Sequence, residues 1–223
     1  MKTILFTKNI STKWLNAHLS HELNFEIIPF LKIENIEPHK FIPKICTESN
    51  HFLISSQNAV NAILNQGING TFFVVGEKTS KKLIQSGFKV NHFEYSAQDL
   101  AKHIIKTQEP KTWNFLCGNN RRDELITVLN KEKHTVNEII CYRSTPIDYH
   151  QKKIFDAITF FSPMGVRSYF KKNILPKSSI IFTIGNTTSD EVRLYTNQMT
   201  VTADKPTLEN LIKTINTHFD VEK

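Results

Sequence analysis

The chain has 223 residues, a formal net charge of +7 at neutral pH and a pI near 9.2. This length admits one large domain or two domains of about 100 to 120 residues, and the charge favours a polyanionic partner. Because the basic residues are scattered and no aromatic ladder accompanies them, we expect a small polyanion as the ligand and no nucleic acid.

The cysteines Cys46, Cys117 and Cys141 are odd in number and too widely spaced for a disulfide framework or a Cys-x-x-Cys metal site. A reducing cytoplasm therefore fits the chain. The first apolar run is interrupted at Lys8, which argues against a signal peptide. Because no segment approaches the roughly 20 apolar residues that span a bilayer, we expect a soluble, cytoplasmic protein with no membrane partner.

Short β-branched and aromatic runs alternate with stretches of helical period, which predicts parallel sheets flanked by helices. The N-terminal segment predicts a strand at 3–7, a helix at 11–21 and a strand at 25–30. Further strands are predicted at 52–55, 71–75, 90–93, 114–117 and 138–142. Of the helices between them, one over 78–85 closes at Gly87, and another opens at Ser96 with a capping box completed by Asp99.

The rest of the chain predicts strands at 157–161, 179–184 and 199–202 and a last helix at 207–218. This set lacks one strand-helix unit, which the N-terminal segment can supply. We therefore predict an α/β fold in which two similar parallel-sheet lobes are joined by a two-stranded linker, with a cleft between them. The first lobe comprises 1–33 and 146–223 and the second 38–140, and the linkers lie at about 31–38 and 140–146.

One short pattern occurs in each predicted lobe. Gly76 and Gly185 each end an apolar strand and are followed, after two residues, by Thr-Ser and an amphipathic helix. The hydroxyl pairs are Thr79-Ser80 and Thr188-Ser189, and Thr187 precedes the second pair. Free N–H groups at helix N-termini bind anions, so the recurrence favours one ligand shared by both lobes. The alternative is that these hydroxyl residues are only N-caps.

Three further turns at strand ends offer polar groups in the same way. Ser56 with Asn58 follows one predicted strand, Ser162 follows another, and the segment Gly118-Asn119-Asn120-Arg121 follows a third. All are candidate ligand-binding positions, because strand ends in parallel sheets lead into helix N-termini.

The arginine pair after this third turn and a tyrosine later in the chain are candidates for substrate binding or catalysis, and each also has a purely structural explanation. Arg121 and Arg122 at a helix start oppose the macrodipole, so they either bind carboxylates or are neutralised at the surface by Asp123 and Glu124. Tyr142 lies at the return crossing between the lobes, where it either faces the ligand or packs the hinge.

The nine histidines raise the question of a metal site, especially His18 and His21, which have helical spacing and Glu22 beside them. No His-Glu-x-x-His pattern is present, and such groups on a helix surface are usually solvated. The chain also contains no nucleophile elbow, phosphate loop or cofactor motif. We therefore predict neither a metal nor a cofactor.

The ordered set of motifs resembles the uroporphyrinogen-III synthase family. The similarity lies in the segment 116–122, both Gly-x-x-Thr-Ser turns, the segment 56–60, Tyr142 in its linker strand, and the segment 203–208. The resemblance spans the chain and implies two flavodoxin-like or closely related α/β lobes. It also implies that hydroxymethylbilane, a linear tetrapyrrole, loses its terminal hydroxyl and closes to uroporphyrinogen III with ring D inverted, in haem biosynthesis.

This reaction is a cyclising dehydration that needs conformational control more than a strong catalyst, and its substrate carries eight carboxylates. By the resemblance, Thr79 and either Thr187 or Thr188 offer hydroxyls to the substrate, with Ser56 and Ser162 nearby, and Tyr142 is the candidate general acid.

Several of these assignments stay open at this stage. A substrate carboxylic acid or an ordered water could replace Tyr142 as the proton donor. Lys8 stands where many family members carry arginine, so it offers a charge without a bidentate fork. We expect a monomer. The alternatives are a non-catalytic two-lobed protein that binds or senses a tetrapyrrole or another polyanion, and a nucleotide or flavin binder.

Overall fold

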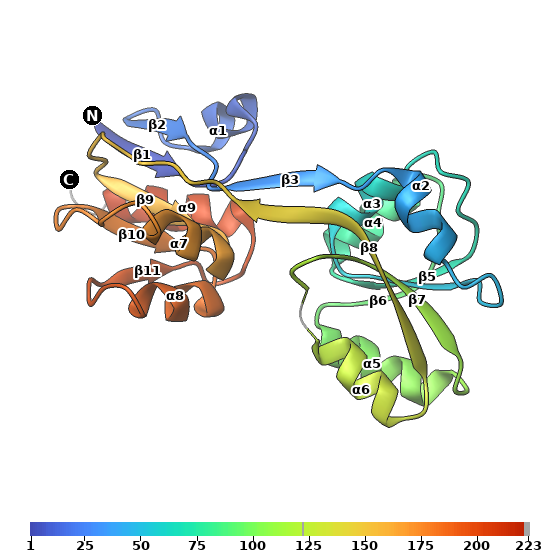
Figure 1. Cartoon of the computed structure of the whole chain (residues 1–223). Helices are drawn as coiled ribbons and strands as arrows, with labels where there is room; N and C mark the ends of the chain where they lie inside the picture. The colour runs from blue at the N-terminus through green and yellow to red at the C-terminus, as the bar shows by residue number, and fades with distance from the viewer. Residues whose placement is uncertain (122, 221–223) are drawn as a thin grey trace. The chain divides into compact units, whose positions relative to one another are not determined.

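The structure, a computed structural model, describes residues 1–121 and 123–220, so the candidate Arg122 lies outside the described residues. Contacts within the chain divide it into two compact units. Lobe 1 comprises Met1–Lys32 and Thr145–Lys223, and lobe 2 comprises Ile33–Ser144. Figure 1 labels the helices and strands of both lobes.

Lobe 1 is built on a five-stranded parallel sheet with the order β11-β10-β9-β1-β2. Its strands are β1 (Lys2–Phe6), β2 (Leu23–Ile27), β9 (Ala157–Phe160), β10 (Ile180–Thr183) and β11 (Thr200–Thr202). Helices α1 (Thr12–His18) and α9 (Leu208–Asp220) pack on one face, and α7 (Pro163–Phe170) and α8 (Asn186–Arg193) pack on the other. Because β1 pairs directly with β9, the N-terminal segment completes the sheet of the C-terminal segment.

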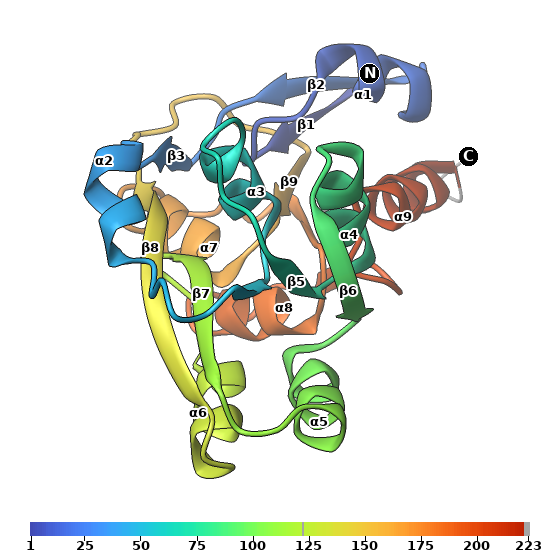
Figure 2. The same cartoon turned by 90° about the vertical axis from the view of Figure 1, so that its right-hand side faces the viewer.

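Lobe 2 contains a six-stranded sheet with the order β3-β8-β7-β4-β5-β6. Its strands are β3 (Leu31–Asn35), β4 (His51–Ile54), β5 (Thr71–Val75), β6 (Lys89–Glu94), β7 (Thr112–Gly118) and β8 (Thr135–Pro146). One face is covered by α2 (Pro38–Phe41), α3 (Gln57–Ile63) and α4 (Glu77–Gln85), with a 3₁₀ turn at Ile42–Lys44. The other face is covered by α5 (Ala97–Thr107) and α6 (Glu124–Lys131), as Figure 2 shows.

The two sheets differ in strand order. Numbered by their order along the chain within the lobe, the strands of lobe 1 run 2-1-3-4-5, which is the flavodoxin order. The parallel strands of lobe 2, counted from β4, run 3-2-1-4-5, which is the dinucleotide-binding order. Each order reverses once, between β1 and β9 in lobe 1 and between β4 and β7 in lobe 2. Ligands of open α/β sheets bind outside the carboxyl ends of the strands at this switch point.

The helix ends follow the predicted capping chemistry. The Ser11 and Ser96 hydroxyls accept hydrogen bonds from backbone N–H groups of α1 and α5, and the Thr207 hydroxyl accepts one from Asn210 of α9. Gly87, just after α4, adopts a φ of 84°, which favours glycine. None of the helices in the described ranges is both long and apolar enough to cross a membrane.

The structure adds to the expectation near both crossings. Helix α2 and a 3₁₀ turn, which the sequence did not predict, lie at the start of lobe 2, with Pro38 in the first helical turn, where a missing N–H costs nothing. Strand β8 is 12 residues long and extends beyond the predicted strand 138–142 at both ends. The strand is long because its first part pairs with the whole of β7 and its last part continues into the return crossing.

A buried amide holds the loop before β4 against the sheet. The Asn114 side chain on β7 is fully buried. Its Oδ1 accepts hydrogen bonds from the Cys46 backbone N–H and from Asn137 Nδ2, each at 2.9 Å. Its Nδ2 donates to the carbonyl oxygens of Cys46 and Ser49 at 3.1 and 3.0 Å. All four bonding positions of the amide are thereby used, and an apolar strand position carries a polar side chain without leaving it unpaired.

We expect Asn114→Ala to lower the free energy of unfolding by about 3 kcal/mol, because four hydrogen bonds are lost and the loop groups are left buried and unpaired. Urea unfolding followed by circular dichroism measures the change. The matched control is Asn91→Ala on the exposed side of β6, which we expect to shift stability by less than about 0.5 kcal/mol. Equal stability of the two variants would contradict the role assigned to this amide.

Candidate active site

The carboxyl ends of four neighbouring strands of lobe 2 form one row of candidate residues. The pairing of β4 with β7 and with β5 places Ser56, Gly118 and Gly76 at equivalent positions, two residues beyond paired strand residues. Gly118 pairs in turn with Tyr142 of β8. Ser56 and Gly118 therefore flank the switch point of this sheet, with Tyr142 on the next strand, at the place where such sheets bind ligands.

The Tyr142 ring lies against the backbone of Gly118. A Cβ atom built on Gly118 would lie 2.4 Å from Cζ, 2.6 Å from Cε2 and 2.8 Å from the phenolic oxygen of Tyr142. These distances are far below van der Waals contact, so no other residue fits at position 118 while the ring stays in place. Glycine is required here for close approach and not for a left-handed backbone conformation.

A slip in the pairing of β7 with β8 orients Tyr142. Cys117 pairs with Ile140, but the next residue, Gly118, pairs with Tyr142, so one residue of β8 is extra. Side chains of a regular strand alternate between faces, yet Cys141 and Tyr142 both pack against the cluster formed with α3 and α4. The bulge thus turns the phenol toward the start of α3, as bulges beside active sites often do.

Two opposing effects act on the pKa of the Tyr142 phenol. Burial raises its pKa, while hydrogen bonds from the side chains of Ser56 and Asn58 lower it, and burial has the larger effect. The group is therefore protonated at neutral pH and held by two polar neighbours. Burial also raises the pKa of the neighbouring thiols, Cys117 to about 11 and Cys141 to about 12, so neither is a thiolate nucleophile.

Ser56 and Asn58 belong to the same helix start. The Ser56 hydroxyl caps α3 by accepting a hydrogen bond from the Asn58 N–H at 3.2 Å. The cap residue therefore has two tasks, since it also contacts the phenol of Tyr142. The sequence placed these residues on a helix start but contained no signal for their contact with Tyr142, which depends on the strand order and on the bulge.

Asn119 continues the strand pairing beyond Gly118. Its backbone N–H donates to the carbonyl of Tyr142 at 3.3 Å, and its Oδ1 accepts from the Ser144 N–H at 2.7 Å. Its Nδ2 donates to the Ser144 carbonyl at 3.4 Å. The side chain thereby acts as one more rung of the sheet and fixes the part of β8 that carries Tyr142.

Arg121 is held by carboxylates of its own lobe. Its guanidinium pairs with Asp123 at 3.1 Å and closely with Glu138 of β8. About a quarter of the side chain is exposed, 27% of its maximum, and Nε is buried without a partner among the described residues. The structure thus pairs this arginine with one of the two acids considered in the sequence and with a third, Glu138, that the sequence did not indicate.

The two Gly-x-x-Thr-Ser turns form equivalent helix starts. Gly76 and Gly185 occupy the N-cap positions of α4 and α8, and each carbonyl accepts a hydrogen bond from the threonine three residues later. The side chains of Thr79 and Thr188 are nearly buried, at 6% and 2% exposure. Thr187, one residue earlier than Thr188, is exposed. The repeated threonines therefore lie mostly under the surface of their own lobes.

Lobe 1 has its own row at its carboxyl edge. Lys8 lies two residues past β1, and its ammonium lies 5.8 Å from the centre of the Phe161 ring. The two residues meet because β1 and β9 are neighbouring strands at the switch point of this sheet. Next to Phe161, the Ser162 hydroxyl caps α7 by accepting from the Gly165 N–H at 3.1 Å. An exposed cation and a helix start therefore flank the switch point of this sheet.

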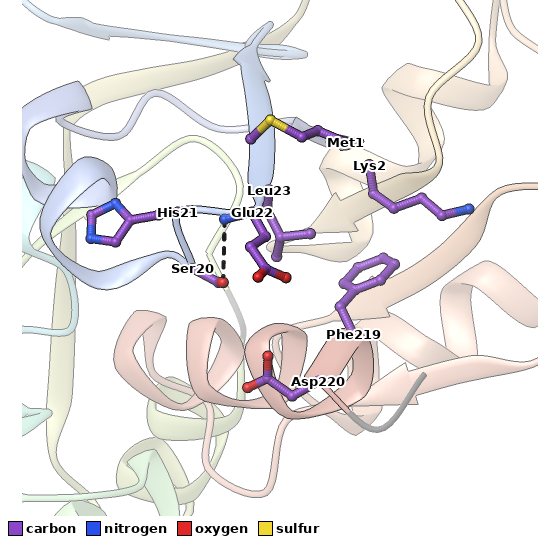
Figure 3. A pocket seen from close by; sticks show the side chains of 8 residues that line it. All are labelled: Met1, Lys2, Ser20, His21, Glu22, Leu23, Phe219 and Asp220. Carbon is purple, nitrogen blue, oxygen red and sulfur yellow. Dashed lines mark hydrogen bonds between the residues drawn. The ribbon is translucent and has the colours of Figure 1, made fainter. Parts of the chain in front are cut away.

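A cavity of about 690 Å³ lies away from these positions, at the amino ends of β1 and β2 (Figure 3). Its lining residues are Met1, Lys2, Ser20, His21, Glu22, Leu23, Phe219 and Asp220. Figure 3 shows the carboxylates of Glu22 and Asp220 in this lining, while the side chain of its single lysine, Lys2, extends away from them. This balance does not favour a polyanion, so we place the candidate site at the carboxyl edges.

Comparisons with known proteins agree with the fold. A family model described as uroporphyrinogen-III synthase HemD matches residues 19–213. The structure is similar to that of uroporphyrinogen-III synthetase from Helicobacter pylori, with a TM-score of 0.71 and 16% identity over 98% of this chain and 100% of that chain. No curated protein sequence matches.

A mutant uroporphyrinogen III synthase from the extremely thermophilic bacterium Thermus thermophilus is also similar, with a TM-score of 0.68 and 13% identity over 100% of this chain and 99% of that chain. At these identities the structures establish the fold, and the predicted α/β class with two parallel sheets is confirmed.

We expect Gly118→Ala to displace the Tyr142 ring and to lower the free energy of unfolding by about 1–3 kcal/mol, the usual cost of overpacking. Denaturant unfolding measures the stability, and absorbance titration of the phenols measures the change at Tyr142. Gly165→Ala in α7 is the control, because its new Cβ would meet the Ser162 hydroxyl at an ordinary 3.4 Å. A Gly118→Ala protein with unchanged stability and phenol titration would refute the close packing.

Proposed function

This chain belongs to the uroporphyrinogen-III synthase family, and we propose on that premise that it acts as a cyclising hydro-lyase. It is an enzyme of porphyrin and haem biosynthesis, and its substrate is a tetrapyrrole. In the proposed reaction, hydroxymethylbilane loses water and closes to uroporphyrinogen III with ring D inverted. The proposal requires a proton donor for the departing hydroxyl and a surface that binds a flexible polyanion.

We assign the proton donor to Tyr142. Transfer of the phenolic proton to the terminal hydroxyl, with cleavage of the carbon–oxygen bond, releases water and leaves an azafulvenium cation and the phenolate. Ring D then attacks through its substituted carbon, and the spiro intermediate opens and closes again with the ring inverted. The pyrrole carbon that forms the last bond loses its proton, which restores the phenol, so the net change is loss of one water.

The observation that carries this assignment is the position of the phenol. The ring crosses Gly118 beside the switch point of lobe 2, next to Ser56 and Asn58. Burial raises the pKa of Tyr142, so the group keeps its proton at neutral pH and can give it to a leaving group. The two polar neighbours can stabilise the transient phenolate by donating hydrogen bonds.

The carboxyl edges of both lobes supply the proposed polyanion contacts. In lobe 2 we propose Ser56, Asn58, Thr79, Gly118 and Asn119 as substrate ligands, and in lobe 1 Lys8, Ser162, Thr187 and Thr188. Helix N-termini at these edges present N–H groups and a positive dipole end to carboxylates. Thr187 is the more accessible hydroxyl of lobe 1, because Thr188 is nearly buried.

Arg121 is a conditional ligand in this proposal. Its guanidinium already has two carboxylate partners, Asp123 and Glu138. Binding of a substrate carboxylate therefore requires exchange of the exposed partner, Asp123, whose side chain is 72% accessible. The net charge of +7 adds long-range attraction for a substrate with eight carboxylates, independent of this exchange.

We further propose that the enzyme acts as a monomer in the cytoplasm. Both carboxyl edges belong to a single chain, so the proposed ligands do not require a second copy. The three cysteines are free thiols, which suits a reducing compartment.

The proposed reaction is tested by supplying freshly prepared hydroxymethylbilane, oxidising the products and separating the isomers by chromatography. We expect isomer III as the main product, whereas spontaneous closure without the enzyme produces isomer I. Formation of isomer I alone, at the rate of the enzyme-free control, would disprove the activity. Tight binding of the product under the same conditions would then identify a binding protein.

We expect Tyr142→Phe to lower kcat by about a hundredfold or more, the range for loss of a general acid, with little change in stability. Tyr195→Phe, which removes a hydroxyl from a partly exposed ring stacked on Phe170, is the control and should keep full activity. If the Tyr142→Phe protein retains more than about a third of the rate, a substrate carboxylic acid or a water molecule donates the proton instead.

A further inference from the structure

Three side chains able to bind a metal converge on the outer edge of lobe 2, away from Tyr142. They are His92 and Glu94 of β6 and His103 of α5, and one potential ligand atom from each lies within 4.8 Å of the others. Strand β6 is the edge strand of the sheet, two strands beyond β4. Figure 2 shows β6 at this edge, with the chain continuing from it into α5.

The backbone explains why these groups meet. His92 and Glu94 are two residues apart on a strand, so their side chains point to the same face. That face is the one covered by α5, whereas the intervening Phe93 packs against the opposite cluster. His103 lies on α5, and its ring stacks on the His92 ring with centroids 3.4 Å apart and planes 4° apart. Glu94 Oε1 lies 2.8 Å from His92 Nε2.

We propose that His92, Glu94 and His103 bind a divalent transition metal ion, with zinc as the best fit and water as the fourth ligand. Two imidazoles and one carboxylate form a set that binds zinc in proteins. Tetrahedral zinc with ligand bonds of about 2.0–2.1 Å places its ligand atoms about 3.3 Å apart. In the structure the ligand atoms lie within 4.8 Å of one another and the two ring planes are parallel, so at least one imidazole must rotate out of the stack to bring both lone pairs onto one ion.

The exposure of the cluster suits metal binding. The side chains of His92 and Glu94 are about one-third exposed, at 30% and 31%, which leaves a path for an ion from solvent. The single carboxylate, Glu94, supplies one negative charge toward a divalent ion.

A bound ion would tie β6 to α5. An edge strand has unpaired backbone groups and only one neighbouring strand to hold it, so a cross-link to the covering helix would strengthen the least supported side of the sheet. This site is separate from the carboxyl-edge row and does not depend on the proposed reaction. We therefore expect zinc to raise the thermal midpoint of unfolding without changing the isomer produced.

The test is zinc titration of the full-length, chelator-treated chain by calorimetry, with cobalt absorption spectra to report the geometry. We expect one zinc per chain and an intense visible cobalt spectrum of tetrahedral type. His92→Gln and His103→Gln should each weaken zinc binding by more than about tenfold. Loss of a group that only supports a metal ligand already costs about tenfold or more, and loss of a ligand should cost at least as much. His39→Gln is the matched control, since His39 also lies beside a glutamate, Glu37, at 3.5 Å.

The outcomes separate a metal site from a packing cluster. Zinc binding that is absent, or that persists unchanged in both the His92→Gln and His103→Gln proteins, for instance on a thiol, would overturn the proposal. Circular dichroism checks that each variant is folded. Should either fail to fold, pulsed electron paramagnetic resonance of copper bound to the unmodified chain decides, because two coupled imidazoles support the site and one or none refutes it.

Discussion

The close approach of the Tyr142 ring to the Gly118 backbone is the contact on which the carboxyl edge of lobe 2 depends. A Cβ at position 118 would lie 2.4 Å from the ring, so glycine at this strand end and a bulge in β8 are needed together. The bulge turns the phenol toward the start of α3, and the ladder that Asn119 extends to Ser144 holds β8 in register beyond it. One backbone approach thereby positions a partly buried phenol beside the switch point of a parallel sheet.

The fold class was accessible from the sequence because its determinants are local. Alternating apolar runs and helical stretches indicate parallel sheets, and Ser11, Ser96 and Gly87 mark helix ends through hydrogen bonds and φ angles that span only a few residues. Strand order is not local. The residues near β4 do not indicate that β5 and β7 are the strands that flank it. The difference between the 2-1-3-4-5 order of lobe 1 and the 3-2-1-4-5 order of lobe 2 is therefore known only from the structure.

The candidate site divides in the same way. Ser56 and Asn58 could be placed at a helix start from their residue types, but their contact with Tyr142 joins positions more than 80 residues apart through a bulge that has no sequence signature. For Arg121 the sequence offered Asp123 or Glu124 as partners, and the structure adds Glu138 from the neighbouring strand. The carboxylate that Arg121 reaches depends on which strand lies beside β7, and residue types alone do not determine that neighbour.

The repeated Gly-x-x-Thr-Ser turn also has a packing basis. Thr79 and Thr188 are nearly buried, and Ser189 bonds through its hydroxyl to Thr200 of β11 at 2.8 Å. Small hydroxyl residues at these positions let the first turn of each helix pack closely on its sheet, and the bond to Thr200 keeps the Ser189 hydroxyl paired. Two sheets with different strand orders would then keep the same turn for a packing reason. The stronger argument for a ligand rests on features that the two lobes do not share: the phenol of Tyr142 in lobe 2 and the exposed ammonium of Lys8 in lobe 1.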